Sequence, residues 1–146
     1  MTAEFVVATH AVVLLNRDKR PLSSEEIAKN VCTNPARVRK VLLKLKKAGI
    51  VETHGGFTGG YAFTADPESV TLKDIFLATG KHFVKVSWRS GSAEKDCPIS
   101  RAMAPVMDEI FDSLDDCCGE KLAQITVADV DRRIPLGIVP GGSHKE

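Results

Sequence analysis

Residues 23–63 read SSEEIAKNVCTNPARVRKVLLKLKKAGIVETHGGFTGGYAF, and this stretch decides the fold of the chain. Ser23 and Glu26 have the spacing of a capping box, in which each side chain binds the backbone amide of the other residue. Asn34 followed by Pro35 is a second helix start, because Asn is a good N-cap and Pro at the first helical position sacrifices no hydrogen bond. These starts predict helices of about 9 and about 14 residues joined by a turn of roughly three, the helix-turn-helix arrangement.

A glycine-rich hairpin is expected directly after the second helix. Gly49 is placed to end that helix as its C-terminal cap. Two short strands are predicted, Ile50 to His54 and Tyr61 to Thr64, and four of the six residues at positions 55–60 are glycine. Glycine reaches backbone angles that other residues avoid, so this segment can form the tip of a β-hairpin. The predicted fold is therefore mainly α with a small β-hairpin, as in a winged helix-turn-helix domain.

Shorter elements flank this domain. Phe5 to Leu15 has apolar residues at helical spacing. Thr71 is placed to cap a helix that runs through Ala78, and residues 126–133 could form a final short helix. Residues 83–86 could form a short strand.

A long amphipathic helix is predicted in the C-terminal half. Apolar residues recur there at intervals of 4, 3, 4, 4 and 3, which marks one face of a helix of about 20 residues. They are Ile99, Met103, Val106, Ile110, Leu114 and Cys117. A chain this short has little other mass with which to cover the stripe, so we expect two copies to pair through it. Packing against the first helix of the same chain is the alternative.

Three segments follow from these elements. Residues 1–80 are expected to form the winged helix-turn-helix DNA-binding domain. Residues 81–134 would supply a sensor loop and the long dimerisation helix, and residues 135–146, rich in Gly and Pro, a flexible tail.

The distribution of charge points to a polyanionic partner. Residues 1–60 carry ten basic and five acidic side chains, whereas residues 61–146 carry ten and fourteen. Arg37, Lys40, Lys44 and Lys47 recur at spacings of 3, 4 and 3, which places them on one helix face. Lys and Arg neutralise phosphates, and Arg can bind guanine through two hydrogen bonds. We therefore expect the helix after Asn34 to bind double-stranded DNA.

The alternative to DNA contact is a basic face that is merely solvated, in a winged-helix module that binds proteins. Such a module would show no salt-dependent binding to duplex DNA. The candidate DNA-binding residues are Ser24, Arg37, Arg39, Lys40, Lys44, Lys47, His54, Thr58 and Tyr61.

Several other classes of protein are disfavoured. The sequence has no phosphate-binding loop followed by Lys and Ser or Thr, and no nucleophile with a clear base, so we do not expect an enzyme. No apolar run is long enough to cross a bilayer, and the N-terminus lacks the basic start of a signal peptide. A cytoplasmic location is the expectation.

The ordered motifs resemble the Rrf-two family of bacterial regulators. They are SEEIA at 24–28, RKVLLKLKKAGIV at 39–51, GGY at 59–61 and VTLKDI at 70–75, and the resemblance runs from about residue 5 to 130. That family includes the iron–sulfur cluster regulator, the nitric-oxide-sensing repressor and the cysteine-metabolism repressor. The resemblance implies a homodimeric transcriptional regulator, expected here to be a repressor, whose long helices, residues 99–118, cross. Family wings often carry more arginine than residues 53–58 do here.

The cysteines do not match the iron–sulfur pattern found in several members of the family that the sequence resembles. Members that hold a cluster use three closely spaced cysteines before the long helix, where this chain has only Cys97. Cys117 lies about 30 Å away along one continuous helix, too far to share a cluster with Cys97. A mixed site of Cys97 with the partner's His10 stays open, although His10 is expected in or beside the core. The cofactor is left open and no metal site is assigned.

Cys97 is the candidate redox sensor. It precedes Pro98 at a helix start, where the amide groups and the helix dipole favour the thiolate. In an antiparallel dimer it could approach Cys117 or Cys118 of the other copy. A redox or small-molecule effector is thus expected, and the alternative is that Cys97 only caps the helix. Cys32 is expected to be buried.

Overall fold

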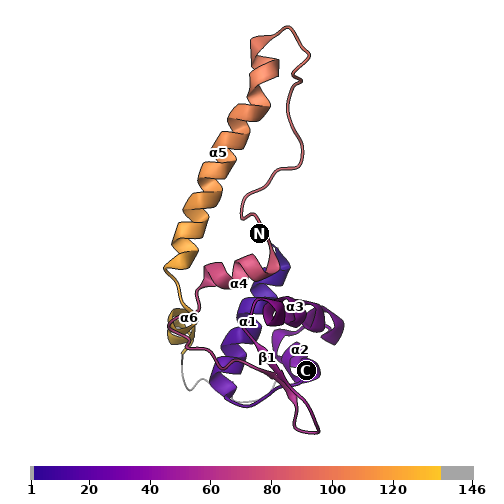
Figure 1. Cartoon of the computed structure of the whole chain (residues 1–146), viewed down its shortest axis with the longest axis vertical. Helices are drawn as coiled ribbons and strands as arrows, with labels where there is room; N and C mark the ends of the chain where they lie inside the picture. The colour runs from indigo at the N-terminus through magenta and orange to yellow at the C-terminus, as the bar shows by residue number, and fades with distance from the viewer. Residues whose placement is uncertain (1, 136–146) are drawn as a thin grey trace, which may run out of the picture.

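The computed structural model describes residues 2–135 as a small helical body with one long projecting helix (Figure 1). Predictions for residues 136–146, most of the expected tail, lie outside the described residues. The body contains five helices and a two-stranded hairpin, and the sixth helix forms the projection. The elements are α1 Ala3–Asp18, α2 Ser24–Val31, α3 Pro35–Lys47, β1 Glu52–His54, β2 Gly60–Ala62, α4 Leu72–Thr79, α5 Pro98–Ala123 and α6 Val127–Arg133.

The local start signals of α2 and α3 are confirmed. The Glu26 amide donates to the Ser23 hydroxyl at 3.1 Å, and the Ser23 amide donates to the Glu26 carboxylate at 2.9 Å. The Asn34 side chain accepts from the Arg37 amide at 2.8 Å. Gly49 adopts φ +75° just after α3, where its amide donates to the carbonyl of Lys46 at 3.0 Å. These contacts fix the helix-turn-helix.

The wing is the antiparallel pair β1–β2, with Thr53 opposite Tyr61. Its base is attached to the turn between α1 and α2, because Leu22 and Tyr61 exchange backbone hydrogen bonds of 2.9 and 2.8 Å. Gly60 permits this close approach: a Cβ atom there would lie 2.4 Å from the Leu22 carbonyl oxygen. The strands are three residues each, shorter than predicted, because pairing stops at the base of the hairpin, where Ile50, Val51 and Phe63 are buried in the core.

The core forms around α1. Fully or almost fully buried apolar side chains come from α1, α3 and α4 and pack as one cluster. Three phenylalanines continue this core toward α5: the ring of Phe76 stacks on Phe83 with centroids 3.8 Å apart and meets Phe5 edge-on at 5.5 Å. The body is thus held by contacts among segments far apart in the sequence.

Residues 81–97 form an extended strap that runs beside α5 rather than the predicted strand at 83–86, so that prediction is wrong (Figure 1). The amides of Phe83 and Val84 donate to the carboxylate of Asp115 at 2.6 and 2.8 Å, in place of a neighbouring strand. These bonds hold the pKa of Asp115 below its usual value, the Val84 amide being the main cause. The strap is anchored to α5 by a side chain that local sequence patterns do not reveal.

α6 returns to the N-terminal body. Its start lies beside that of α4, where the Val127 amide donates to the Val70 carbonyl at 2.9 Å. Its end contacts α1 through an ion pair of 2.5 Å between Arg17 and Asp131. α6, which the sequence groups with the long helix, therefore packs on the first helix. Among residues 2–135, no helix has the length and apolar character needed to cross a membrane.

Candidate nucleic-acid interface

α3 presents its apolar side to the core and its basic side outward. Val38, Val41, Leu42 and Leu45 are all 0% exposed, as helical spacing predicts. The basic side chains of α3 therefore lie on the remaining faces, and three separate environments distinguish them.

The first environment faces α1. The carboxylate of Glu4 forms ion pairs with Lys40, at 3.0 Å, and with Lys44. These two contacts, that of Lys44 first, lower the pKa of Glu4, so the carboxylate is charged at neutral pH. Lys44 is half-buried, whereas Lys40 remains mostly exposed. Two of the four side chains on the predicted DNA face thus have a partner within the chain.

The second environment faces α2. The Arg39 guanidinium donates to the Ser24 hydroxyl at 3.2 Å and lies 3.3 Å from the Glu25 carboxylate. The Glu25 backbone amide, then Ser24 and Arg39, lower the pKa of Glu25. Ser24 is buried, at 7% exposure, so its hydroxyl supports Arg39 from beneath rather than standing free at the surface.

The third environment is open solvent. Arg37, Lys46 and Lys47 are exposed, and none of them forms an ion pair within residues 2–135. Arg37 and Lys47 belong to the predicted set, and Lys46 flanks it. These three cations can therefore bind a phosphate without first breaking an ion pair within the described residues.

The predicted wing residues are not equivalent. His54 is exposed, with its Nε2 atom 3.9 Å from the Glu52 carboxylate. Thr58 is exposed at the tip, while the Tyr61 side chain is half-buried against the core. Directly before Thr58 lies Phe57, which the sequence does not mark as a DNA-binding candidate and which is 111% exposed. An aromatic residue among four glycines is the signal that could have identified it.

The cysteines are widely separated. Cys97 is exposed at the N-cap of α5, and Cys117 and the half-buried Cys118 lie near its other end. α5 is continuous between them, so the structure does not bring Cys97 and Cys117 of one chain together. Cys32 is exposed, not buried as predicted, because the chain turns outward there at φ +62°. No cluster of three His, Cys, Asp or Glu that could hold a metal occurs within residues 2–135.

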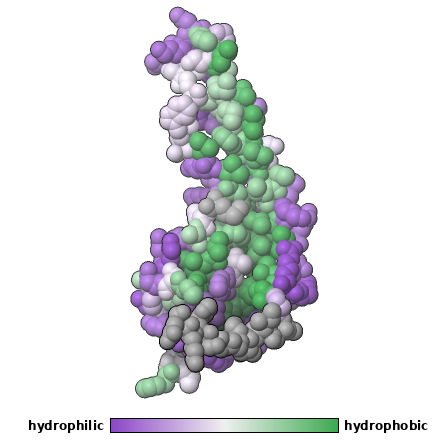
Figure 2. Space-filling model, turned by 180° about the vertical axis from the view of Figure 1, so that it is seen from behind, coloured by the Kyte–Doolittle hydropathy of each residue, from purple (hydrophilic) through white to green (hydrophobic). Residues whose placement is uncertain are grey.

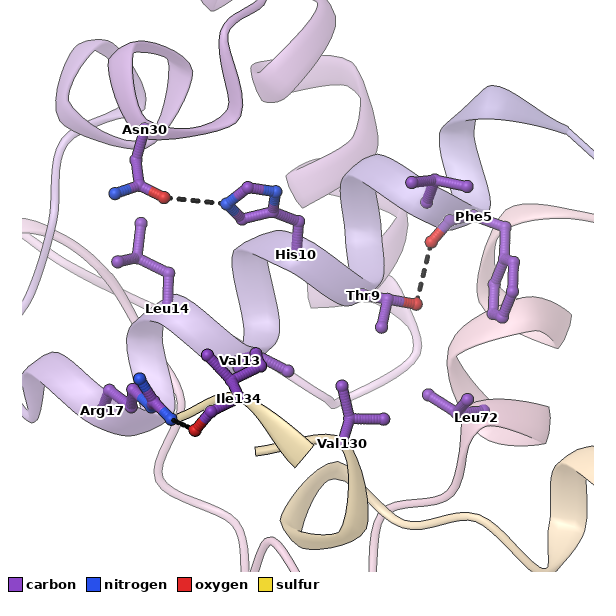
Figure 3. Close-up of a pocket in the computed structure, with 11 residues that line it drawn as sticks. Phe5, Thr9, His10, Val13, Leu14, Arg17, Asn30, Leu72, Val130 and Ile134 are labelled. Carbon is purple, nitrogen blue, oxygen red and sulfur yellow. Dashed lines mark hydrogen bonds between the residues drawn. The ribbon is translucent and has the colours of Figure 1, made fainter. Parts of the chain in front are cut away.

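A groove of about 500 Å³ follows the outer face of α1 (Figure 3). Apolar side chains line most of it, among them Val13, Leu14 and Val130. His10 is exposed at its edge rather than in the core, where its ring lies 2.7 Å from the Asn30 side-chain oxygen. The opposite end is closed by Arg17, which donates to the Ile134 carbonyl at 2.8 Å.

α5 carries a second apolar surface. The side chains of its stripe are 37–68% exposed, and they are Ile99, Met103, Val106, Ile110 and Leu114. Figure 2 shows a band of apolar side chains that follows α5 down to the body. The stripe that the sequence predicts therefore has no cover within the described chain.

Comparison with known proteins gives a consistent match. The model of a family described as "Rrf2: Iron-dependent Transcriptional regulator" matches residues 1–133. YwnA of Bacillus subtilis (strain 168), named as an HTH-type transcriptional regulator, is 30% identical over 130 residues, which make up 89% of this chain and 96% of YwnA.

Solved structures share the fold. A protein described as a transcriptional regulator from Lactobacillus plantarum has a TM-score of 0.78 at 24% identity, with 90% of this chain and 89% of that chain covered. CymR, the global cysteine regulator of B. subtilis, has a TM-score of 0.67 at 18% identity, with 92% and 98% covered. At these identities the likeness establishes the fold alone.

Proposed function

Because the chain belongs to the Rrf2, or Rrf-two, family of transcriptional regulators, we propose that it is a homodimeric, sequence-specific DNA-binding repressor that responds to a redox or small-molecule signal. In this proposal residues 1–80 bind DNA, and residues 81–134 sense the signal and pair the subunits. The repressor role follows the resemblance to family repressors. A regulator of this kind acts where the DNA is, in the cytoplasm.

The observation that carries the DNA-binding role is the open basic surface of α3. Arg37, Lys46 and Lys47 are exposed and have no ion pair within residues 2–135. Each can neutralise a phosphate and release a counterion. Arg39 is held beside α2 by Ser24 and Glu25, which gives it a defined position from which to read a base edge.

The proposed dimer rests on the uncovered stripe of α5. Leaving Ile110 and Val106 at 45% and 47% exposure in water is unfavourable, and pairing removes that cost. A two-fold axis would lay the stripe of one copy on that of the other, since a self-complementary surface needs no second binding site.

The proposed signal acts at Cys97. Its thiol is exposed at the N-cap of α5, next to the proposed pairing surface. A change of charge or size there would alter how the long helices pair. A small molecule in the groove along α1 is a second route for a signal, because this groove is apolar and lies beside α6.

Salt-dependent binding tests the function. Fluorescence anisotropy with a labelled duplex of about 30 bp, long enough for two half-sites one helical turn apart, is measured over a series of KCl concentrations. We expect Lys47→Ala to weaken binding and to reduce the salt slope by about 0.9, as for one lost phosphate contact. A matched control is Lys121→Ala, which removes a cation from α5. Binding that is absent or independent of salt would favour the protein-interaction module instead.

A further inference from the structure

The tip of the wing exposes a large apolar side chain. Phe57 is 111% exposed, whereas Phe5, Phe63, Phe76 and Phe83 are at most 8% exposed. Single exposed apolar residues are common on proteins. A phenylalanine at the extreme of a projecting hairpin is different, because it meets whatever the hairpin meets before any other side chain does.

The backbone on both sides of Phe57 carries few side chains. Positions 55, 56, 59 and 60 are glycine, so no side chain flanks the ring in the tip except that of Thr58. Gly56 adopts φ +90°, and the Gly59 amide donates to its carbonyl at 3.1 Å, which makes a tight turn. A backbone without side chains can approach another molecule closely.

The base of the wing is held firmly. Leu22 and Tyr61 exchange two backbone hydrogen bonds, so the hairpin is attached to the turn that leads into α2. The base of the hairpin therefore has a fixed position relative to the helix-turn-helix. In Figure 1 the hairpin lies at the end of the molecule opposite the free end of α5.

The wing lacks the usual means of holding a phosphate. Residues 52–64 contain neither Lys nor Arg. The histidine of this segment, His54, lies 3.9 Å from the carboxylate of Glu52, which would repel a phosphate nearby. The wing therefore offers no Lys or Arg side chain to a phosphate, and its dominant exposed group is apolar.

We infer that Phe57 is the wing's contact with DNA and that it enters the minor groove as an apolar wedge between two base pairs. This inference rests on the proposed DNA-binding function. The minor groove is about 6 Å wide, and phenylalanine is among the side chains that pry base steps apart there. Insertion bends the duplex by about 20–90° toward the major groove. The cations of α3 supply attraction to the phosphates, and Phe57 supplies shape and bending.

The inference is tested with Phe57→Ala and with Phe57→Leu, which keeps an apolar group of similar reach. The probe is a duplex of about 30 bp that the wild-type protein has enriched from random sequences, with a donor and an acceptor dye at its two ends. Anisotropy gives affinity and salt slope, and energy transfer between the dyes gives bending. Leu77→Ala, which removes an exposed apolar side chain from α4, is the matched control.

We expect Phe57→Ala to bind about tenfold more weakly, as for the loss of part of a buried apolar side chain. Its salt slope should stay unchanged, because no phosphate contact is removed, and the increase in energy transfer on binding should be lost. Phe57→Leu should retain most of both, and Leu77→Ala should match wild type.

Two outcomes overturn the inference and can be told apart. If Phe57→Ala binds and bends the duplex as wild type does, the wedge is excluded while the DNA-binding function stands. If the wild-type protein enriches no duplex and shows no salt-dependent binding, the proposed function fails and the wedge fails with it.

Discussion

The carboxylate of Glu4 lies 3.0 Å from the ammonium group of Lys40, so the first turn of α1 is joined to the most basic helix of the chain. The same carboxylate also pairs with Lys44, one helical turn further along α3. If α3 binds DNA as proposed, Glu4 would compete with DNA phosphates for two of the six cations between Asn34 and His54. A side chain outside the helix-turn-helix thereby limits the charge that the helix can offer.

Glu4→Gln is expected to raise the affinity for duplex DNA. Freeing Lys40 and Lys44 for phosphate should steepen the plot of log affinity against log salt by about 0.9 for each new contact. Anisotropy titrations over a range of KCl concentrations measure this slope. Glu120→Gln, which removes an exposed carboxylate from α5, should leave the slope unchanged. A slope equal to that of wild type would contradict this prediction. It would mean that the two lysines bind DNA in both proteins or in neither.

Ile110→Glu is expected to convert the proposed dimer into monomers. In a two-fold dimer the substitution places a carboxylate from each copy in an apolar interface, and burying unpaired charge is costly. Sedimentation at micromolar concentration should change from about twice 15.8 kDa to that mass. Arg101→Glu adds the same group to the opposite side of α5 and should remain dimeric. Wild-type protein that sediments as a monomer would refute pairing through the stripe.

Under the proposed redox role, Cys97→Ser is expected to abolish the response to peroxide. The Cys97 thiolate would attack the peroxide, giving a sulfenic acid and water, and a thiol of the second copy could condense with it to a disulfide with loss of a further water. We expect oxidised wild-type protein to bind DNA about tenfold more weakly, a change of about 1.4 kcal/mol.

The readouts for this response are DNA affinity and a covalent dimer on non-reducing gels. Cys32→Ser, which removes the exposed thiol of the turn before α3, should respond as wild type does. If Cys97→Ser loses affinity on oxidation as wild type does, another group must sense the oxidant.

Asp129 links the stability of α6 to pH. The Thr126 amide and the Arg132 guanidinium lower the pKa of Asp129 from 3.8 to about 2. Because the folded value is depressed, the stabilisation is present above the unfolded value of 3.8 and is lost as the pH falls toward 2. Thermal unfolding should show Asp129→Asn less stable than wild type at pH 7, with the gap closing as the pH falls from 3.8 toward 2.

Asp112→Asn, which removes an exposed carboxylate from α5, is the control for Asp129. It should show no such gap at pH 7. A gap for Asp129→Asn that persists unchanged at pH 2 would show that the carboxylate stabilises α6 by packing rather than by its charge.

Local signals carried the prediction of the fold. The cap of α2 by Ser23 and Glu26 and that of α3 by Asn34 depend on residues three positions apart, and both are present. The stripe of α5 was equally visible from its spacing, although the helix continues to Ala123, five residues beyond the predicted end. Elements whose stabilising contacts lie within one or two helical turns can be predicted from the sequence alone.

Contacts between distant segments were not predictable. The strap at 83–86 has the composition of a strand, but its amides bind Asp115, about thirty residues away. The pairing of Glu4 with Lys44 spans forty residues and removes a predicted DNA contact from open solvent. Spacing within α3 gave the faces of the helix correctly, but not which face turns toward α1.

The length of α5 would set the distance between the two DNA-binding domains of the proposed dimer. Its 26 residues, at about 1.5 Å each, measure roughly 39 Å, close to the 34–36 Å that separate successive turns of a DNA groove. In a dimer joined along this helix, its length and the place where the copies cross set the distance between the two recognition helices. Adding or removing a turn of α5 would therefore change the spacing between the two DNA half-sites that the protein accepts. Each recognition helix would stay unchanged.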